Sequence, residues 1–281
     1  MSVFSFIKRK FYNLTHPELG QILMLHRVTE QRSQLLANRE LEVTPDFLEQ
    51  TIIDYRQRGY RFVDMDEVAR VVKGGKQKRK FVCFTFDDGY ADNYTMAFPI
   101  FKKYNCPFTI NITTDFYERK ALLWWYVLED LGVTDDEFSA LRKEIFKLKN
   151  SEIEPFFEIR FPQGNYSFEQ TVRQMALSAE QIKALSDSGL CTIGNHTISH
   201  QNLTALSYSE QEHQIVEAMR KLEAVTGKYV RHFAFPYGLY NSDTLRILEK
   251  NGTFTATKTW GGKIRRGDNR LLLNRMELRE E

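Results

Sequence analysis

The sequence lacks the features of disulfide-rich, membrane-spanning and nucleic-acid-binding proteins. Its 281 residues include only three cysteines, and no apolar run approaches the roughly 20 residues of a membrane-spanning helix. Lysine and arginine (39) nearly balance aspartate and glutamate (37), and the net charge of +2 is too small to indicate a nucleic-acid surface. The 42% hydrophobic and 27% charged fractions argue against disorder, collagen and coiled coil, and favour a globular protein with a sizeable core.

The cysteines and the N-terminus favour a cytoplasmic protein. Cys83, Cys106 and Cys191 lie in apolar surroundings at spacings unlike a zinc ribbon, so we expect small buried hydrophobes in a reducing compartment. A secretory signal places its charges before a long apolar core, whereas residues 1–14 begin with a short apolar stretch and then turn basic. Residues 4–12, FSFIKRKFY, could touch an anionic membrane surface. We favour a simple terminal helix for this segment.

Short apolar runs alternate with helical patterns along most of the chain. We expect strands at 22–25, 61–63, 81–86, 107–112, 190–194, 232–236, 253–258 and 271–278. The run at 81–86, FVCFTF, has no polar alternation, which suits a strand buried on both faces in a parallel sheet. Repeated βα units therefore predict an α/β fold, a TIM-like (β/α)7-8 barrel in place of an open sheet.

Helix boundaries carry recognisable capping residues. Thr44 and Ser178 each precede a helical pattern as an N-cap. Ser207 and Glu210 have capping-box spacing at the start of a long helix, and Gly227 follows its end. A further helix is expected from about 92 to 104, interrupted or kinked by Pro99.

The segment from about 117 to 177 breaks this βα rhythm. It begins with Trp124, Trp125 and Tyr126 and then becomes charged and helical. We interpret it as a mostly helical insertion on the rim of one barrel domain that spans residues 1–281. The tryptophans could stack on sugar rings, but packing of the insertion onto the barrel is the favoured role.

Three strand ends carry candidate site residues. The strand FTF ends in Asp87 and Asp88 before a turn-forming glycine, and catalytic groups of barrels lie at the C-terminal ends of strands. NHTISH (195–200) follows another strand, and the i, i+4 pair His196 and His200 can face one ion, with an aspartate as third ligand. FAFPYG (233–238) ends a third strand in a turn whose backbone N–H groups could bind an oxyanion.

Together these motifs resemble the polysaccharide deacetylase family, the chitin-deacetylase-like carbohydrate esterases of family four. TFDDG followed about 110 residues later by H-[ST]-x-x-H carries the resemblance, and LMLHRV (23–28) and FLEQTIIDYRQRGYRFVDMDEV (47–68) are also similar. The resemblance covers roughly residues 20–278, apart from the insertion. It implies a distorted (β/α) barrel and metal-dependent hydrolysis of an N-acetyl group on a sugar.

The resemblance also implies roles for individual residues. Asp88, His196 and His200 would bind a divalent metal, for which we expect zinc, with cobalt or nickel as alternatives. Asp87 would be the general base, and the metal and the backbone N–H of Tyr237 would hold the oxyanion.

This chain departs from the family pattern at two positions. Ala234 stands where the family commonly has an arginine that orients the base, and Arg27 or Arg275 could supply that guanidinium; we favour Arg275. The C-terminal Leu-x-His that provides the general acid is missing. His26, at the end of the first strand, is equally a candidate for that acid and a structural residue.

Three functions follow as hypotheses. The first is a metal-dependent hydrolase that removes an N-acetyl group from an amino sugar of a bacterial surface polysaccharide or its precursor. The second is a deformylase or other amide hydrolase acting on a lipid-linked or non-sugar substrate. The third is a catalytically weak glycan-binding protein. The expected partner is an N-acetylated glycan, with no nucleic acid and, as an alternative, peripheral membrane contact.

Overall fold

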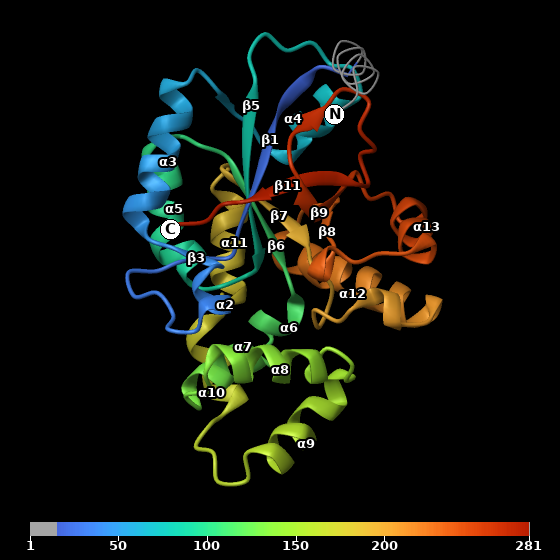
Figure 1. Ribbon diagram of the computed structural model, residues 1–281. Coiled ribbons are helices and arrows are strands. Elements are labelled where there is room, and N and C mark those ends of the chain that lie inside the picture. The colour runs from blue at the N-terminus through green and yellow to red at the C-terminus, as the bar shows by residue number, and fades with distance from the viewer. Residues whose placement is uncertain (1–15, 281) are drawn as a thin grey trace, which may run out of the picture.

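Seven parallel strands close into a barrel in the computed structural model, which describes residues 16–280 (Figure 1). Around the barrel the order is β1–β11–β9–β8–β7–β6–β5, and β5 pairs with β1 to close the ring. The seven strands are β1 (Glu18–Leu25), β5 (Phe81–Asp88), β6 (Phe108–Ile112), β7 (Cys191–Asn195), β8 (His232–Ala234), β9 (Thr255–Gly261) and β11 (Leu273–Glu277). The predicted α/β barrel is confirmed, with seven strands in the ring.

Short strands make the barrel uneven. β4 (Arg61–Phe62) pairs with the first residues of β5, and β6 takes over further along β5. β10 (Ile264–Arg265) pairs antiparallel with the start of β1, while β2 (Arg27–Val28) and β3 (Glu42–Val43) form a separate pair. The barrel is therefore distorted, because different partners cover the two halves of β1 and β5.

Helices between the strands pack on the outside of the barrel. They are α2 (Leu36–Arg39), α3 (Pro45–Gln57), α4 (Met65–Val72), α5 (Phe98–Lys103), α6 (Thr114–Tyr117), α11 (Ala179–Asp187), α12 (Tyr208–Thr226) and α13 (Ser242–Lys250). The side chains of Thr44, Ser178 and Ser207 cap α3, α11 and α12 as predicted, and Gly227 ends α12 with a left-handed φ of 70°. The interruption expected near Pro99 is a π-helical turn (Asn93–Ala97), after which Pro99 lies in the first turn of α5.

Side chains of the strands fill the barrel, and they include buried polar groups such as Thr85 and Arg275 beside the apolar ones. All eight residues of β5 are buried, as expected for a strand covered on both faces. Cys83, Cys106 and Cys191 are free and buried, in agreement with their interpretation as small hydrophobes. Within residues 16–280, no helix is long and apolar enough to cross a membrane. The basic segment 4–12, for which we weighed membrane contact, lies outside the described residues.

The predicted insertion forms a helical layer at one end of the barrel (Figure 1, green to yellow-green). It contains α7 (Trp124–Asp130), α8 (Asp135–Ile145), α9 (Asn150–Arg160) and α10 (Phe168–Met175). Their buried side chains form a core of their own, in which Trp124 stacks on Phe138. Trp124 is therefore mainly a packing residue, as favoured from the sequence. The layer rejoins the barrel where Ala176 forms a β-bridge with Tyr90.

Candidate active site

The end of β5 brings two adjacent carboxylates into one cavity. Side chains on a regular strand alternate between its faces, but Asp88 has a left-handed φ of 73°. This backbone turn allows Asp87 and Asp88 to line the same cavity of about 470 Å³. Left-handed backbone at a non-glycine residue costs energy and is typical of functional sites.

Asp87 is held by an arginine fork. Arg275 on β11 donates from its two terminal nitrogens to the two carboxylate oxygens of Asp87, at 2.8 and 2.6 Å, and Asn111 on β6 donates to one of them at 2.9 Å. Burial by itself raises the pKa of Asp87, but the charge and hydrogen bonds of Arg275, together with the nearby His196, outweigh burial and hold that pKa well below its usual range. Asp87 is therefore an ionised carboxylate inside the barrel.

The structure distinguishes the two candidate arginines. Arg275 is completely buried, and its Nε donates to the carbonyl of Lys258 at 2.8 Å. Arg27 instead forms ion pairs with Glu42 and Asp92, at 3.0 and 2.7 Å, beside the insertion. Of these two arginines, Arg275 is the one that contacts Asp87.

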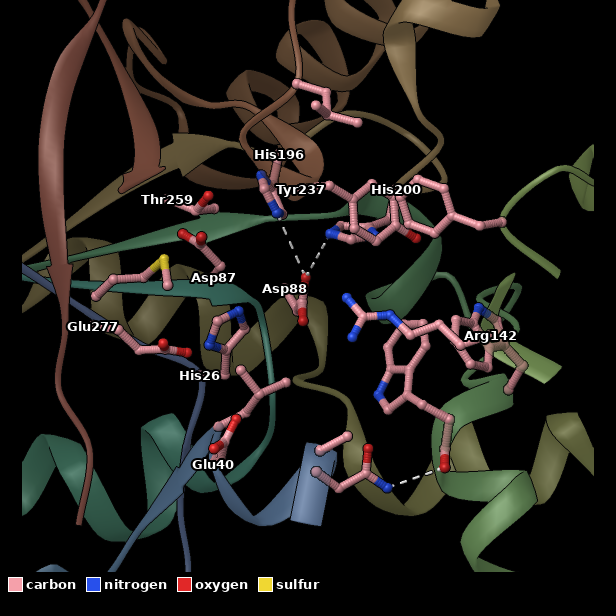
Figure 2. A pocket seen from close by; sticks show the side chains of 18 of the residues that line it. His26, Glu40, Asp87, Asp88, Arg142, His196, His200, Tyr237, Thr259 and Glu277 are labelled. Carbon is pink, nitrogen blue, oxygen red and sulfur yellow. Dashed lines mark hydrogen bonds and ion pairs between the residues drawn. The ribbon is translucent and has the colours of Figure 1, made fainter. Parts of the chain in front are cut away.

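Asp88, His196 and His200 form a three-residue cluster. The Nε2 atoms of His196 and His200 lie 3.6 and 3.5 Å from Oδ1 of Asp88 (Figure 2). Among the described residues, these are the only three His, Cys, Asp or Glu side chains close enough to hold one metal ion together. Separations of this size between ligand atoms suit an ion bound at about 2.0–2.2 Å.

The protonation states of this cluster also suit a cation. Burial lowers the pKa of His196 to about 4 and that of His200 well below 6.5, so both imidazoles are neutral with a lone pair available. Burial, followed by the charge of Asp87, raises the pKa of Asp88 to about 8, and its buried Oδ1 has no hydrogen-bond partner among residues 16–280. A divalent ion such as zinc would supply the missing positive charge, so the residues fit a metal site.

Backbone contacts aim the His196 imidazole and shape the loop that carries His200. Nδ1 of His196 donates to the carbonyl of Ala234 at 2.8 Å, which leaves Nε2 facing Asp88. The chain from 195 to 200 is a compact loop in which Thr197 and His200 have left-handed φ values of 71° and 55°. Asn195 accepts from the backbone N–H of Thr197 and donates to the carbonyl of Ile215, which ties the loop to α12.

Tyr90 lies between the metal-ligand cluster and the insertion. No role for this residue was predicted from the sequence. The Tyr90 hydroxyl lowers the pKa of Asp88 against the effect of burial, and Nε1 of Trp125 donates to the Tyr90 hydroxyl at 3.2 Å. Tyr90 is 1% exposed and immediately follows the Asp-Asp-Gly turn. Its position directly after the turn was the one feature of the sequence that could have indicated a role in the site.

His26 and Tyr237 line the same cavity. Burial lowers the pKa of His26 to about 4, and its buried Nδ1 has no hydrogen-bond partner within the described chain. Tyr237 has a left-handed φ of 58°, and its ring lies 4.5 Å from that of His200. The structure thus brings together all seven residues named from the sequence.

Residues near β9 and β10 lie away from the cavity. Trp260 is half exposed and does not line the cavity. Lys263 and Arg265 contact Glu18 and the carbonyl of His16 at the start of β1. With about 3.3 Å per strand residue, that end of β1 is about 25 Å from His26.

The family resemblance is confirmed by comparison with known proteins. Residues 74–256 match the family model described as polysaccharide deacetylase. This match covers more than half of the chain, which therefore belongs to the polysaccharide deacetylase family.

Individual relatives are distant. YxkH of Bacillus subtilis (strain 168) is 22% identical over 258 residues, which are 92% of this chain and 70% of that protein. The chitooligosaccharide deacetylase of Azorhizobium caulinodans is 43% identical over 61 residues, 21% of this chain and 29% of that protein. The Streptococcus pyogenes deacetylase PplD, solved with acetate, has a TM-score of 0.67 and 23% identity over 92% of both chains, a likeness of fold.

Proposed function

We propose that this protein is a metal-dependent hydrolase that removes an N-acetyl group from an amino sugar of a bacterial surface polysaccharide or its precursor. One observation carries the proposal: the Asp88–His196–His200 cluster lies beside a separately anchored Asp87 in one cavity. The family supports deacetylation, and the Azorhizobium relative is named for N-acetylated sugar oligomers.

In this proposal the cluster holds zinc, with cobalt or nickel as alternatives. A metal bound there would supply Lewis-acid chemistry, which would polarise the acyl carbonyl and lower the pKa of a water molecule. Asp87 accepts the proton of the attacking water, and Arg275 keeps its carboxylate ionised and oriented. The water oxygen forms a bond to the acyl carbon, the C–N bond breaks, and acetate and a free amine result.

His26 and Tyr237 complete the proposed mechanism. The backbone N–H of Tyr237 stabilises the developing oxyanion. His26 is neutral at rest, so it first takes up a proton at its unpartnered Nδ1 and then gives it to the leaving amine. Asp87 lines the cavity beside His26 and is the source of that proton.

The test is acetate release from chitooligosaccharides by zinc-loaded protein. Chelation should abolish release, and zinc, cobalt or nickel should restore it. Asp87→Asn should reduce kcat by about a hundredfold or more, as loss of a general base does. Asp136→Asn, an exposed substitution on α8, should retain full activity.

The product distinguishes the alternatives. Formate release from a formylated sugar without acetate release would favour a deformylase. Glycan binding with tightly held metal and no turnover would favour a binding protein.

A further inference from the structure

Arg142 is a cavity-lining cation without a protein partner. It lies on α8 and lines the cavity with Asp88 and His200, yet its guanidinium forms no hydrogen bond or ion pair with any residue from 16 to 280. The other arginine that lines this cavity, Arg279, is paired with Glu277 and Glu40. An unpaired guanidinium offers five donors in a fork that matches carboxylate or phosphate oxygens.

A second cavity, also lined by cationic side chains, continues from the first along the insertion. It has a volume of about 190 Å³ and shares Trp125, His200 and Tyr237 with the first cavity. Lys147 and Lys149, between α8 and α9, line it, and neither forms an ion pair within the described chain. Lys149 lies near Glu210, which leaves Lys147 as the second free cation.

The charges on the two sides of the cavity differ. Figure 2 shows Arg142 on one side of Asp88 and Glu277 on the other. Arg279 pairs with both Glu277 and Glu40, which leaves a net negative charge there, so the free positive charge lies on the insertion side. Preference for cations in the last turn of a helix accounts for basic residues there in general. It does not explain why Arg142 lines the cavity while its neighbour Lys143 does not.

We propose that the substrate is an anionic glycan, whose carboxylate or phosphate group binds Arg142 and, further along, Lys147. This inference rests on the proposed function and specifies its substrate class. The aromatic walls formed by Trp125 and Tyr237 suit the sugar rings, and the insertion supplies the charge recognition that selects acidic glycans over neutral ones.

Three N-acetylated ligands test this inference. They are chitotetraose, which is neutral, a hyaluronan tetrasaccharide, which carries carboxylates, and N-acetylglucosamine 1-phosphate. Binding is measured by calorimetry on metal-stripped protein, and KM is measured by acetate release from zinc-loaded protein. We expect at least one anionic ligand to bind more tightly than chitotetraose, and the stronger of the two identifies the recognised group.

Matched variants assign the effect to Arg142. Arg142→Gln should weaken anion binding about tenfold more than chitotetraose binding, the loss expected for one charge-assisted hydrogen bond. Lys143→Gln, on the same helical turn, should retain the wild-type preference. Tighter binding of chitotetraose than of both anions, or an equal response of all ligands to Arg142→Gln, would overturn the inference. Absence of product from every substrate would instead overturn the proposed function, and the binding data would still decide the charge preference.

Discussion

Arg275 and Asp87 are 188 positions apart in the chain, yet they form two parallel hydrogen bonds inside the barrel, at 2.8 and 2.6 Å. Both side chains are almost completely buried. A buried pair of this kind is costly to break, because the remaining charge has no water to solvate it.

Loss of the Arg275 fork should therefore reduce both stability and activity. Arg275→Gln should lower the free energy of unfolding by about 3–5 kcal/mol, because Asp87 stays charged and buried without its ion-pair partner. Arg275→Lys keeps the charge but loses the second hydrogen bond, so it should be more stable than Arg275→Gln and still impaired in kcat. Urea unfolding and acetate release measure the two effects. Wild-type stability in Arg275→Gln would contradict this interpretation.

Zinc-binding measurements should distinguish the three proposed metal ligands from a histidine outside the cluster. Asp88→Asn, His196→Ala and His200→Ala each remove one of three donors and should weaken zinc binding by at least about a hundredfold. Calorimetry or competition with a chromogenic chelator gives the dissociation constant. His213→Ala, on the exposed face of α12, is the matched control and should bind one zinc ion normally. Unchanged affinity in all three cluster variants would exclude this metal site.

The insertion should influence metal affinity through Tyr90. Tyr90→Phe removes only the hydroxyl that accepts from Trp125 and lowers the pKa of Asp88, so the fold should persist while zinc affinity falls about 10–100-fold. Trp125→Phe should produce a smaller decrease in the same direction. Tyr94→Phe, whose ring stacks on Phe98 away from the site, should leave the affinity unchanged. Equal affinities for Tyr90→Phe and Tyr94→Phe would show that the hydroxyl plays no part.

Local sequence patterns predicted much of the fold and the site residues that lie within short motifs. Uninterrupted apolar strands such as 81–86 predicted the parallel barrel, and Asp87, Asp88 and His196 follow strand ends, where such barrels collect their side chains. The helix caps at Thr44 and Ser207 could also be predicted from local sequence. In each, the capping side chain accepts a hydrogen bond from a backbone N–H only three residues away.

The remaining contacts depend on long-range geometry that one sequence does not reveal. Arg27 and Arg275 both lie in strand-like surroundings, and only closure of the barrel brings Arg275 to Asp87. Asn111 resembles any polar residue in a strand until its contact with Asp87 is seen. Arg265 lies at the opposite end of the barrel from Asp87, because β10 pairs with the start of β1.

His26 should make the folded state sensitive to acid. Its pKa is lowered from 6.5 to about 4, since burial disfavours the charged imidazole. Between pH 4 and pH 6.5, His26 is protonated in the unfolded chain but neutral in the folded chain. The stabilising effect is therefore complete above pH 6.5 and is lost as the pH falls toward 4, by about 3 kcal/mol in total.

Substitution of His26 tests this pH dependence. His26→Gln should show a shallower decrease in the free energy of unfolding between pH 6.5 and 4, measured by urea unfolding of metal-free protein. His213→Gln, an exposed substitution, should keep the wild-type slope. His196 and His200 contribute equally to all three proteins, so an identical slope for His26→Gln and the wild type would contradict the prediction.

Gly194 should be required for the position of Asn111 beside Asp87. A Cβ atom at residue 194 would lie 2.2 Å from Oδ1 of Asn111, and Asn111 is only 2% exposed, so it has little room to move. Gly194→Ala should therefore cost about 1–3 kcal/mol of stability through overpacking. It should also lower kcat about tenfold, because displacement of the amide removes its hydrogen bond to the Asp87 carboxylate.

A double-mutant cycle distinguishes this clash from a general backbone effect. If Gly194→Ala acts through Asn111, the Asn111→Ala change makes room for the added methyl group. The double variant should then be more stable than the sum of the two single effects predicts, by about 0.5–3 kcal/mol. Strict additivity in urea unfolding would mean that residue 194 acts on another neighbour, such as the carbonyl of His232 at 3.3 Å from the same Cβ position.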